Sequence, residues 1–88
     1  MPNFIPYPGR IHFDPMHEKS AYSDEGDVIE AGKVISIGEG VTFTKPGDTV
    51  FFLRWGAEQT PEIDGKQYWT LLDDKRFIMG VLRNENAI

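Results

Sequence analysis

The sequence contains no cysteine, few windows that favour a helix and no long hydrophobic run. Without cysteine, a disulfide framework, a thiolate zinc site and a cysteine nucleophile are excluded. No apolar run approaches the ~20 residues of a membrane span. The first residues lack the basic and apolar regions of a signal peptide. We therefore expect a cytoplasmic protein without a membrane partner.

Basic residues are also scarce. Nine lysines and arginines stand against fourteen aspartates and glutamates, which gives a net charge of −5. The chain has no basic stripe that would attract a phosphate backbone or anionic lipid headgroups. We therefore expect no nucleic-acid partner.

The length of 88 residues is enough for one compact domain and too small for two. A domain of this size buries only ~60–65% of the surface that its unfolded chain exposes. Oligomerisation is one way to add stability to so small a core. We expect a single domain over residues 1–88, with a frayed tail at residues 84–88.

Short runs of β-branched and aromatic residues, separated by glycine and proline, fill most of the chain. Nine glycines and six prolines leave few windows of more than ten residues for a helix. The polar stretch 17–27 predicts a loop. The runs predict an all-β sandwich or small barrel of about five to seven short strands. The clearest strands are expected at 10–13, 33–37, 49–54, 67–72 and 77–82, with turns at 45–48 and 64–65.

No group of residues has the spacing of a catalytic, metal or cofactor site. His12 falls on the outward face of the first predicted strand, and His17 lies in the polar stretch. Asp73 and Asp74 adjoin two basic residues, so local ion pairing and turn capping explain them. The Gly-x-Gly at 38–40 is not followed by a helix that could bind a phosphate. The sequence predicts no enzyme activity, no cofactor and no metal.

Aromatic residues occur in adjacent pairs on two predicted strands. Phe51 and Phe52 point to opposite faces of one strand, and Tyr68 and Trp69 to opposite faces of another. One set belongs to the core. The other set lines a subunit interface or forms an exposed binding patch.

Four sequence blocks follow one another along the chain. They are IP and RIHF within 5–13, GKVISIGEG at 32–40, KPGDTVFF at 45–52 and IDGKQYWTLLDDKRFIMGVL at 63–82. In this order they resemble the opening, G-x-V-x-x-[VI]-G-x-G, K-x-G-D-x-V and closing D-G elements of the GroES-type co-chaperonins. The resemblance covers nearly the whole chain, and it implies a small GroES-like β-barrel.

The resemblance also implies a homo-oligomeric ring, which is sevenfold in that family. The first and last strands of neighbouring subunits pair there, so that ring closure covers two exposed strand edges. The corresponding interface residues are Phe4, Ile5, Gly80, Val81 and Leu82.

A mobile loop that binds a GroEL-type chaperonin, and so assists protein folding, is a further implication of the resemblance. It corresponds to residues 18–31, with Gly26, Asp27, Val28 and Ile29 as the partner-binding residues. Here the loop is short, and Asp27 stands where the family has an aliphatic residue. An unpaired carboxylate in an apolar groove costs several kcal/mol.

The stretch 41–44 is also too short for the roof hairpin that closes the dome in that family. Phage-encoded members rebuild these same regions. Two functions therefore stay open. One is a co-chaperonin, and the other is a non-catalytic structural module, such as a phage decoration protein that binds capsid protein in the virion.

Overall fold

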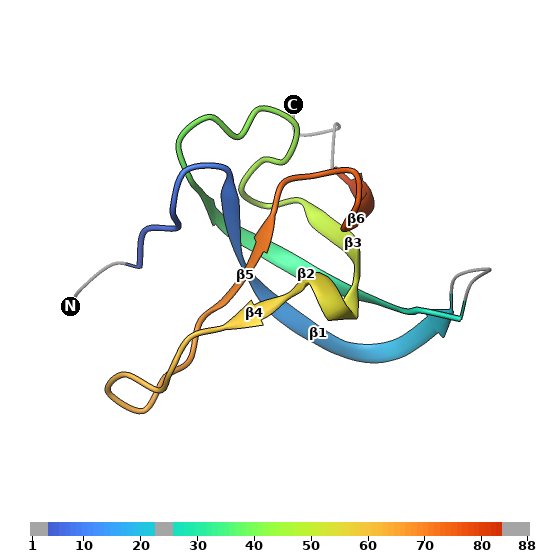
Figure 1. The fold of residues 1–88 in the computed structure, drawn as a ribbon, viewed down its shortest axis with the longest axis horizontal. Coiled ribbons are helices and arrows are strands. Elements are labelled where there is room, and N and C mark those ends of the chain that lie inside the picture. The colour runs from blue at the N-terminus through green and yellow to red at the C-terminus, as the bar shows by residue number, and fades with distance from the viewer. Residues whose placement is uncertain (1–3, 23–25, 84–88) are drawn as a thin grey trace.

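The computed structural model describes residues 4–22 and 26–83. Within these residues, six strands form one antiparallel sheet in the order β4-β5-β1-β2-β3-β6 (Figure 1). A short 3-10 turn, η1, spans Arg54–Gly56 after β3. The strands are β1 Arg10–Tyr22, β2 Val28–Ile37, β3 Thr49–Leu53, β4 Glu58–Gln59, β5 Trp69–Leu72 and β6 Ile78–Leu82.

One face of the sheet carries the hydrophobic core. Alternate residues point inward, so that Ile11 and Phe13 of β1 are buried, as are Val50 and Phe52 of β3. The Phe13 and Phe52 rings lie 4.7 Å apart at the centre of the cluster. The remaining core residues come from three other strands and one loop, which requires the sheet to curl around them: Val34, Val41, Leu71 and Ile78. The predicted all-β, small barrel-like fold is confirmed.

The loop predicted over 17–27 is wrong for most of its length, because β1 and β2 form a hairpin arm. Strand β1 continues to Tyr22, which lies opposite Val28, the first residue of β2. Pro15 does not end the strand. Among the described residues, β5 pairs with β1 only as far as Phe13, so beyond Phe13 this edge of β1 has no neighbouring strand. A proline is tolerated at such an edge because no neighbour needs its missing N–H. Only 23–25, at the end of the arm, lies outside the described residues.

The two turns predicted from local chemistry are present. Asp64 and Gly65 adopt φ values of 53° and 79°, and a bridge joins Ile63 to Lys66 across them. Gly47 has a φ of 94° in the turn before β3. Both turns need left-handed backbone, which glycine adopts without steric cost.

Candidate functional site

Strand β6 is an edge of the sheet, and its only strand neighbour in the described part of the chain is β3. Gly80 lies opposite Phe51, but Ile78 lies opposite Phe52, so Met79 is the extra residue of a β-bulge. Met79 and Leu82 are 62% and 64% exposed. With neighbouring strands, this edge forms an open apolar groove lined by Ile29, Phe51, Met79, Gly80, Val81 and Leu82.

The other expected interface residues, Phe4 and Ile5, do not form a strand in the single chain. Pro6 and Pro8 follow this segment, and each proline removes a backbone hydrogen-bond donor. Instead, the Phe4 ring stacks on the Tyr68 ring, with 4.6 Å between centroids and an angle of 7°. Ile5 is 79% exposed. Within one chain, Phe4 therefore makes an aromatic contact, and the next residue, Ile5, presents an exposed aliphatic side chain.

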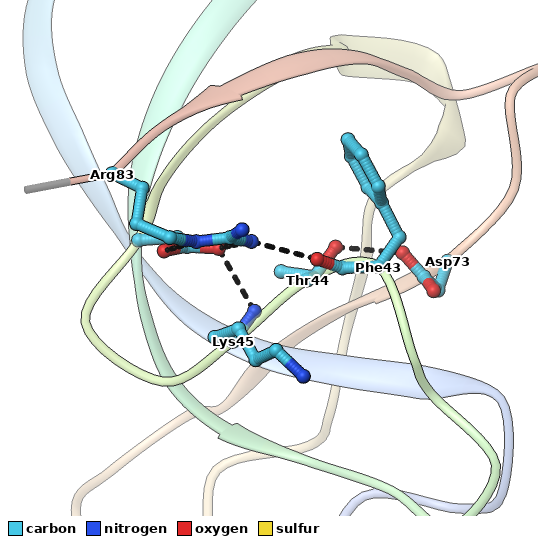
Figure 2. Close-up of polar contacts among 6 residues, drawn as sticks. Phe43, Thr44, Lys45, Asp73 and Arg83 are labelled. Carbon is cyan, nitrogen blue, oxygen red and sulfur yellow. Dashed lines mark hydrogen bonds and ion pairs between the residues drawn. The ribbon is translucent and has the colours of Figure 1, made fainter. Parts of the chain in front are cut away.

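A polar network holds the end of β6 against the turn that precedes β3 (Figure 2). Asp48 is only 2% exposed. Its carboxylate accepts hydrogen bonds from Arg83 Nε at 2.9 Å and Arg83 Nη2 at 2.7 Å. The backbone N–H of Lys45 donates to the same carboxylate at 2.8 Å. Arg83 Nη2 also donates to the carbonyl oxygen of Phe43 at 2.7 Å, so one guanidinium joins the chain after β6 to two parts of the loop.

Hydrogen bonds from the Arg83 side chain are the main cause that holds the pKa of Asp48 below its usual value. Burial acts in the opposite direction and is the weaker effect. Asp48 is therefore an ionised, paired carboxylate at neutral pH. Its partner lies 35 residues away in sequence, and no short motif links the two positions.

The two adjacent aspartates that follow β5 have different partners. Asp74 accepts hydrogen bonds from the backbone N–H and the guanidinium of Arg76, which lower its pKa, and this confirms the predicted local pairing. Asp73 accepts a hydrogen bond from Thr44 Oγ1 at 2.6 Å, so its partner is distant rather than local. Thr44 is fully buried. This second bond fastens the 41–48 loop to the end of β5 (Figure 2).

His12 lies on the outer face of β1, as the alternation predicts, but it is only 5% exposed. The rings of Phe4 and Tyr68 cover it, with centroids 5.1 Å and 5.3 Å away. Ser36 Oγ lies 3.4 Å from its Nδ1. Burial lowers the pKa of His12, a nearby Asp14 carboxylate partly opposes this shift, and Lys66 adds to it. The predicted outward position is correct, and the two rings bury the histidine there.

The four expected partner-binding residues do not share one environment. Gly26 is exposed and has a φ of 89°. Asp27 is half-buried. Val28 pairs with Tyr22 near the end of the arm. Ile29 pairs with Leu53 of β3 and lines the β6 groove. Ile29 also pairs with Ala21 of β1, so Val28 and Ile29 both belong to the arm, and Ile29 in addition lies beside β3 and the groove.

Among the residues whose side chains the structure describes, 4–16 and 26–83, no group of three or more histidines, aspartates or glutamates is placed to hold a metal ion. In the same part of the chain, no helix has the length and apolar character needed to cross a membrane. No protein-family model and no curated protein matches the sequence. Function is therefore inferred from the residues and their arrangement.

Proposed function

We propose that the protein is a non-catalytic subunit of a homo-oligomeric ring, which acts as a co-chaperonin in the cytoplasm. The β6 edge carries the proposal. It combines a strand edge that has no partner among the described residues with an apolar groove, in a domain of 88 residues. Such an edge pairs readily with another chain, so proteins that keep one usually cover it.

Each subunit has two different candidate contact surfaces, which favours a head-to-tail ring over a twofold-symmetric dimer. The β6 groove is lined by residues of β2, β3 and β6. The exposed Ile5 belongs to a separate hollow with His12 and Tyr68, which shares no lining residue with that groove. When one surface of a subunit contacts a different surface of the next, repetition of the contact closes a ring or extends a filament.

The β1–β2 arm supports the contact with a chaperonin. Figure 1 draws the end of β1 and the start of β2 extending beyond the other strands. Gly26 is exposed at that end, and Val28 is the nearest apolar residue of β2. A single arm would bind weakly. Several arms on one ring would bind together, because the second contact is made at a high effective concentration.

Assembly is tested by the mass of the protein in solution. Wild type should have a multiple of the 10.0 kDa chain mass, seven times it for a family-like ring. Leu82→Glu places a charge in the apolar groove at an exposed position, so the chain should fold and dissociate. Ile63→Glu is the control, because Ile63 is also exposed but lies in the 63–66 turn. A monomeric wild type, or a ring that survives Leu82→Glu, would contradict ring assembly.

The chaperonin contact needs a variant that leaves assembly intact. Val28→Ser removes the apolar side chain on the arm and spares the β6 groove, whereas a change at Ile29 would disturb both. The variant should keep the wild-type mass and lose co-elution with a purified GroEL-type chaperonin. Ile63→Ser should keep both. Equal chaperonin binding by wild type and Val28→Ser would refute this role for the arm.

The pairing of the arm favours a second function. Val28 is half-buried and hydrogen-bonded within a hairpin rather than presented on an irregular loop. A structural module, such as a decoration protein on a phage capsid, would need no chaperonin-binding loop. An oligomer that binds no chaperonin and images as a trimer, or as a lattice on capsids, would support this function over the first.

A further inference from the structure

The segment before β1 is anchored close to the sheet, but its first two described residues extend beyond that anchor. Arg10 N–H donates to the Tyr7 carbonyl at 2.9 Å, and Gly9 N–H donates to the Glu39 carbonyl at 2.9 Å. Gly38 approaches the Tyr7 carbonyl so closely that it leaves no room for a side chain. Residues 4 and 5, which we call the N-terminal flap, lie before these contacts.

The flap covers the one buried histidine among the residues whose side chains the structure describes. Phe4 lies face to face with Tyr68, and the His12 ring stands at 66° and 68° to these two rings. Phe4 and Ile5 form one wall of a hollow of about 440 Å³, and the sheet and the 66–68 segment form the others. Displacement of the flap would therefore open His12 to water.

A β-bulge brings β2 into the same hollow. His12 lies opposite Ser36, but Phe13 lies opposite Val34, so Ile35 is the extra residue. Ile35 is consequently exposed on the outer face and lines the hollow. The surroundings of His12 are thus apolar on the flap side and on the Ile35 side.

Polar groups approach His12 from several segments. Thr70 of β5 lies opposite it and accepts a hydrogen bond from Arg10 Nη1 at 3.3 Å. Asp14 on β1 is the carboxylate that acts on it, and Lys66 is the opposing cation. Lys66 itself lies over the Tyr68 ring, 5.4 Å from its centroid. The Ser36 hydroxyl on β2 contacts Nδ1 at the long distance of 3.4 Å.

We infer that His12 makes docking of the N-terminal flap depend on pH. The neutral imidazole packs between Phe4 and Tyr68, and the flap stays closed. The charged imidazolium requires hydration that the aromatic cover prevents, and the flap opens.

The sign follows from proton linkage. Burial lowers the pKa of His12 in the closed state below the value of about 6.5 that it has in water. The open state therefore binds the proton more readily than the closed state. Docking is fully favourable above about pH 6.5, and its equilibrium constant falls by up to about tenfold per pH unit below that, until the closed-state pKa is reached.

Nuclear magnetic resonance of the full chain tests the inference. Contacts between the Phe4 and Tyr68 ring protons should weaken as the pH is lowered from about 7.5 to 5. His12→Asn keeps a hydrogen-bonding group near Ser36 and should abolish this pH dependence. His17→Asn, which removes the other histidine, should leave it unchanged. Ring contacts that do not change with pH in wild type, or that change equally in His12→Asn, would overturn the inference.

A second measurement does not require the His12 variant to keep its structure. The pKa of His12, followed by its own ring resonances, should rise toward 6.5 in Phe4→Ala, because the cover is gone. An unchanged pKa would overturn the inference. Ile5→Ala is the matched control, since its side chain is exposed and should contribute little to the burial of the imidazole.

Flap opening should also weaken assembly, because Phe4 and Ile5 are expected interface residues. This consequence rests on the proposed function. If the ring forms, its mass should decrease over the same pH range in wild type and not in His12→Asn. The two proposals fail separately. A monomer whose flap still responds to pH contradicts the ring alone, and a ring whose flap ignores pH contradicts the switch alone.

Discussion

Replacing Arg83 by methionine should destabilise the fold more than any other single change of a surface charge. Methionine keeps most of the aliphatic length but removes every donor that Arg83 offers. Asp48 would lose the hydrogen bonds from Nε and Nη2, and the Phe43 carbonyl would lose its bond from Nη2. Among the described residues, a carboxylate that is 2% exposed would then keep the Lys45 backbone N–H as its one donor.

The expected loss is about 2 kcal/mol in the free energy of unfolding. Removing one partner of a buried pair costs about 3–5 kcal/mol, because the other charge is left without compensation. The Asp48 site is shallow, since the Arg83 side chain that covers it is 36% exposed. Water can reach the carboxylate once the guanidinium is gone, so we expect a loss of about 2 kcal/mol, which is below that range. For a domain of this size it corresponds to a fall in Tm on the order of 10 °C.

The pH dependence of this loss follows from the depressed pKa of Asp48. The ionised carboxylate contributes its full stabilisation above its unfolded pKa of about 3.9. This contribution is lost as the pH falls through the lower pKa of the folded state. The difference between wild type and Arg83→Met should therefore be full at pH 7 and should shrink below about pH 4.

Urea unfolding followed by tryptophan fluorescence measures the difference directly. It should be repeated at two protein concentrations, because assembly adds to apparent stability by mass action. Arg76→Met is the matched control, since Arg76 pairs with Asp74 on the exposed surface and should contribute far less. Equal effects of Arg83→Met and Arg76→Met, or a difference that persists unchanged in acid, would refute the reasoning.

Three further substitutions test the fold by the same unfolding assay. Gly38→Ala drives a Cβ against the Tyr7 carbonyl and should cost about 1–3 kcal/mol, with a shift in the Tyr7 backbone resonances; an unshifted Tyr7 would contradict the close contact. Gly65→Ala forces alanine to a φ of 79° and should cost about 1–2 kcal/mol; a neutral result would mean that the turn changes type. Ile11→Val removes a methyl group from the core and should cost about 1 kcal/mol. Exposed Ile63→Val should stay within about 0.5 kcal/mol, and equal losses would contradict the assigned core.

Local chemistry was enough to predict the parts of the fold that depend on neighbouring residues. The 64–65 and 45–48 turns form where glycine supplies a positive φ. The inward positions of Ile11 and Phe13 follow from simple alternation. The same reasoning failed at 17–22, where a mostly polar stretch belongs to β1, because the pairing of Ala21 and Tyr22 with β2 has no signal in the local composition.

The candidate sites were less accessible to sequence reasoning, because their members are far apart in the chain. His12 was placed on the correct face, but its burial depends on Tyr68 and on the flap. Asp48 was recognised as a turn residue, whereas its pairing with Arg83 had no sequence signal. Both features depend on which segments the sheet brings together.

The sequence by itself determined the all-β class, the main turns and the inward residues of the strands. Backbone preference and alternation act over only a few residues, so local patterns predict them. Only the tertiary structure decided that β6 ends the sheet, that Arg83 closes over Asp48 and that Phe4 covers His12. Strand order and burial depend on contacts between segments tens of residues apart. Their energies exist only after the chain has folded and are not encoded in any local window.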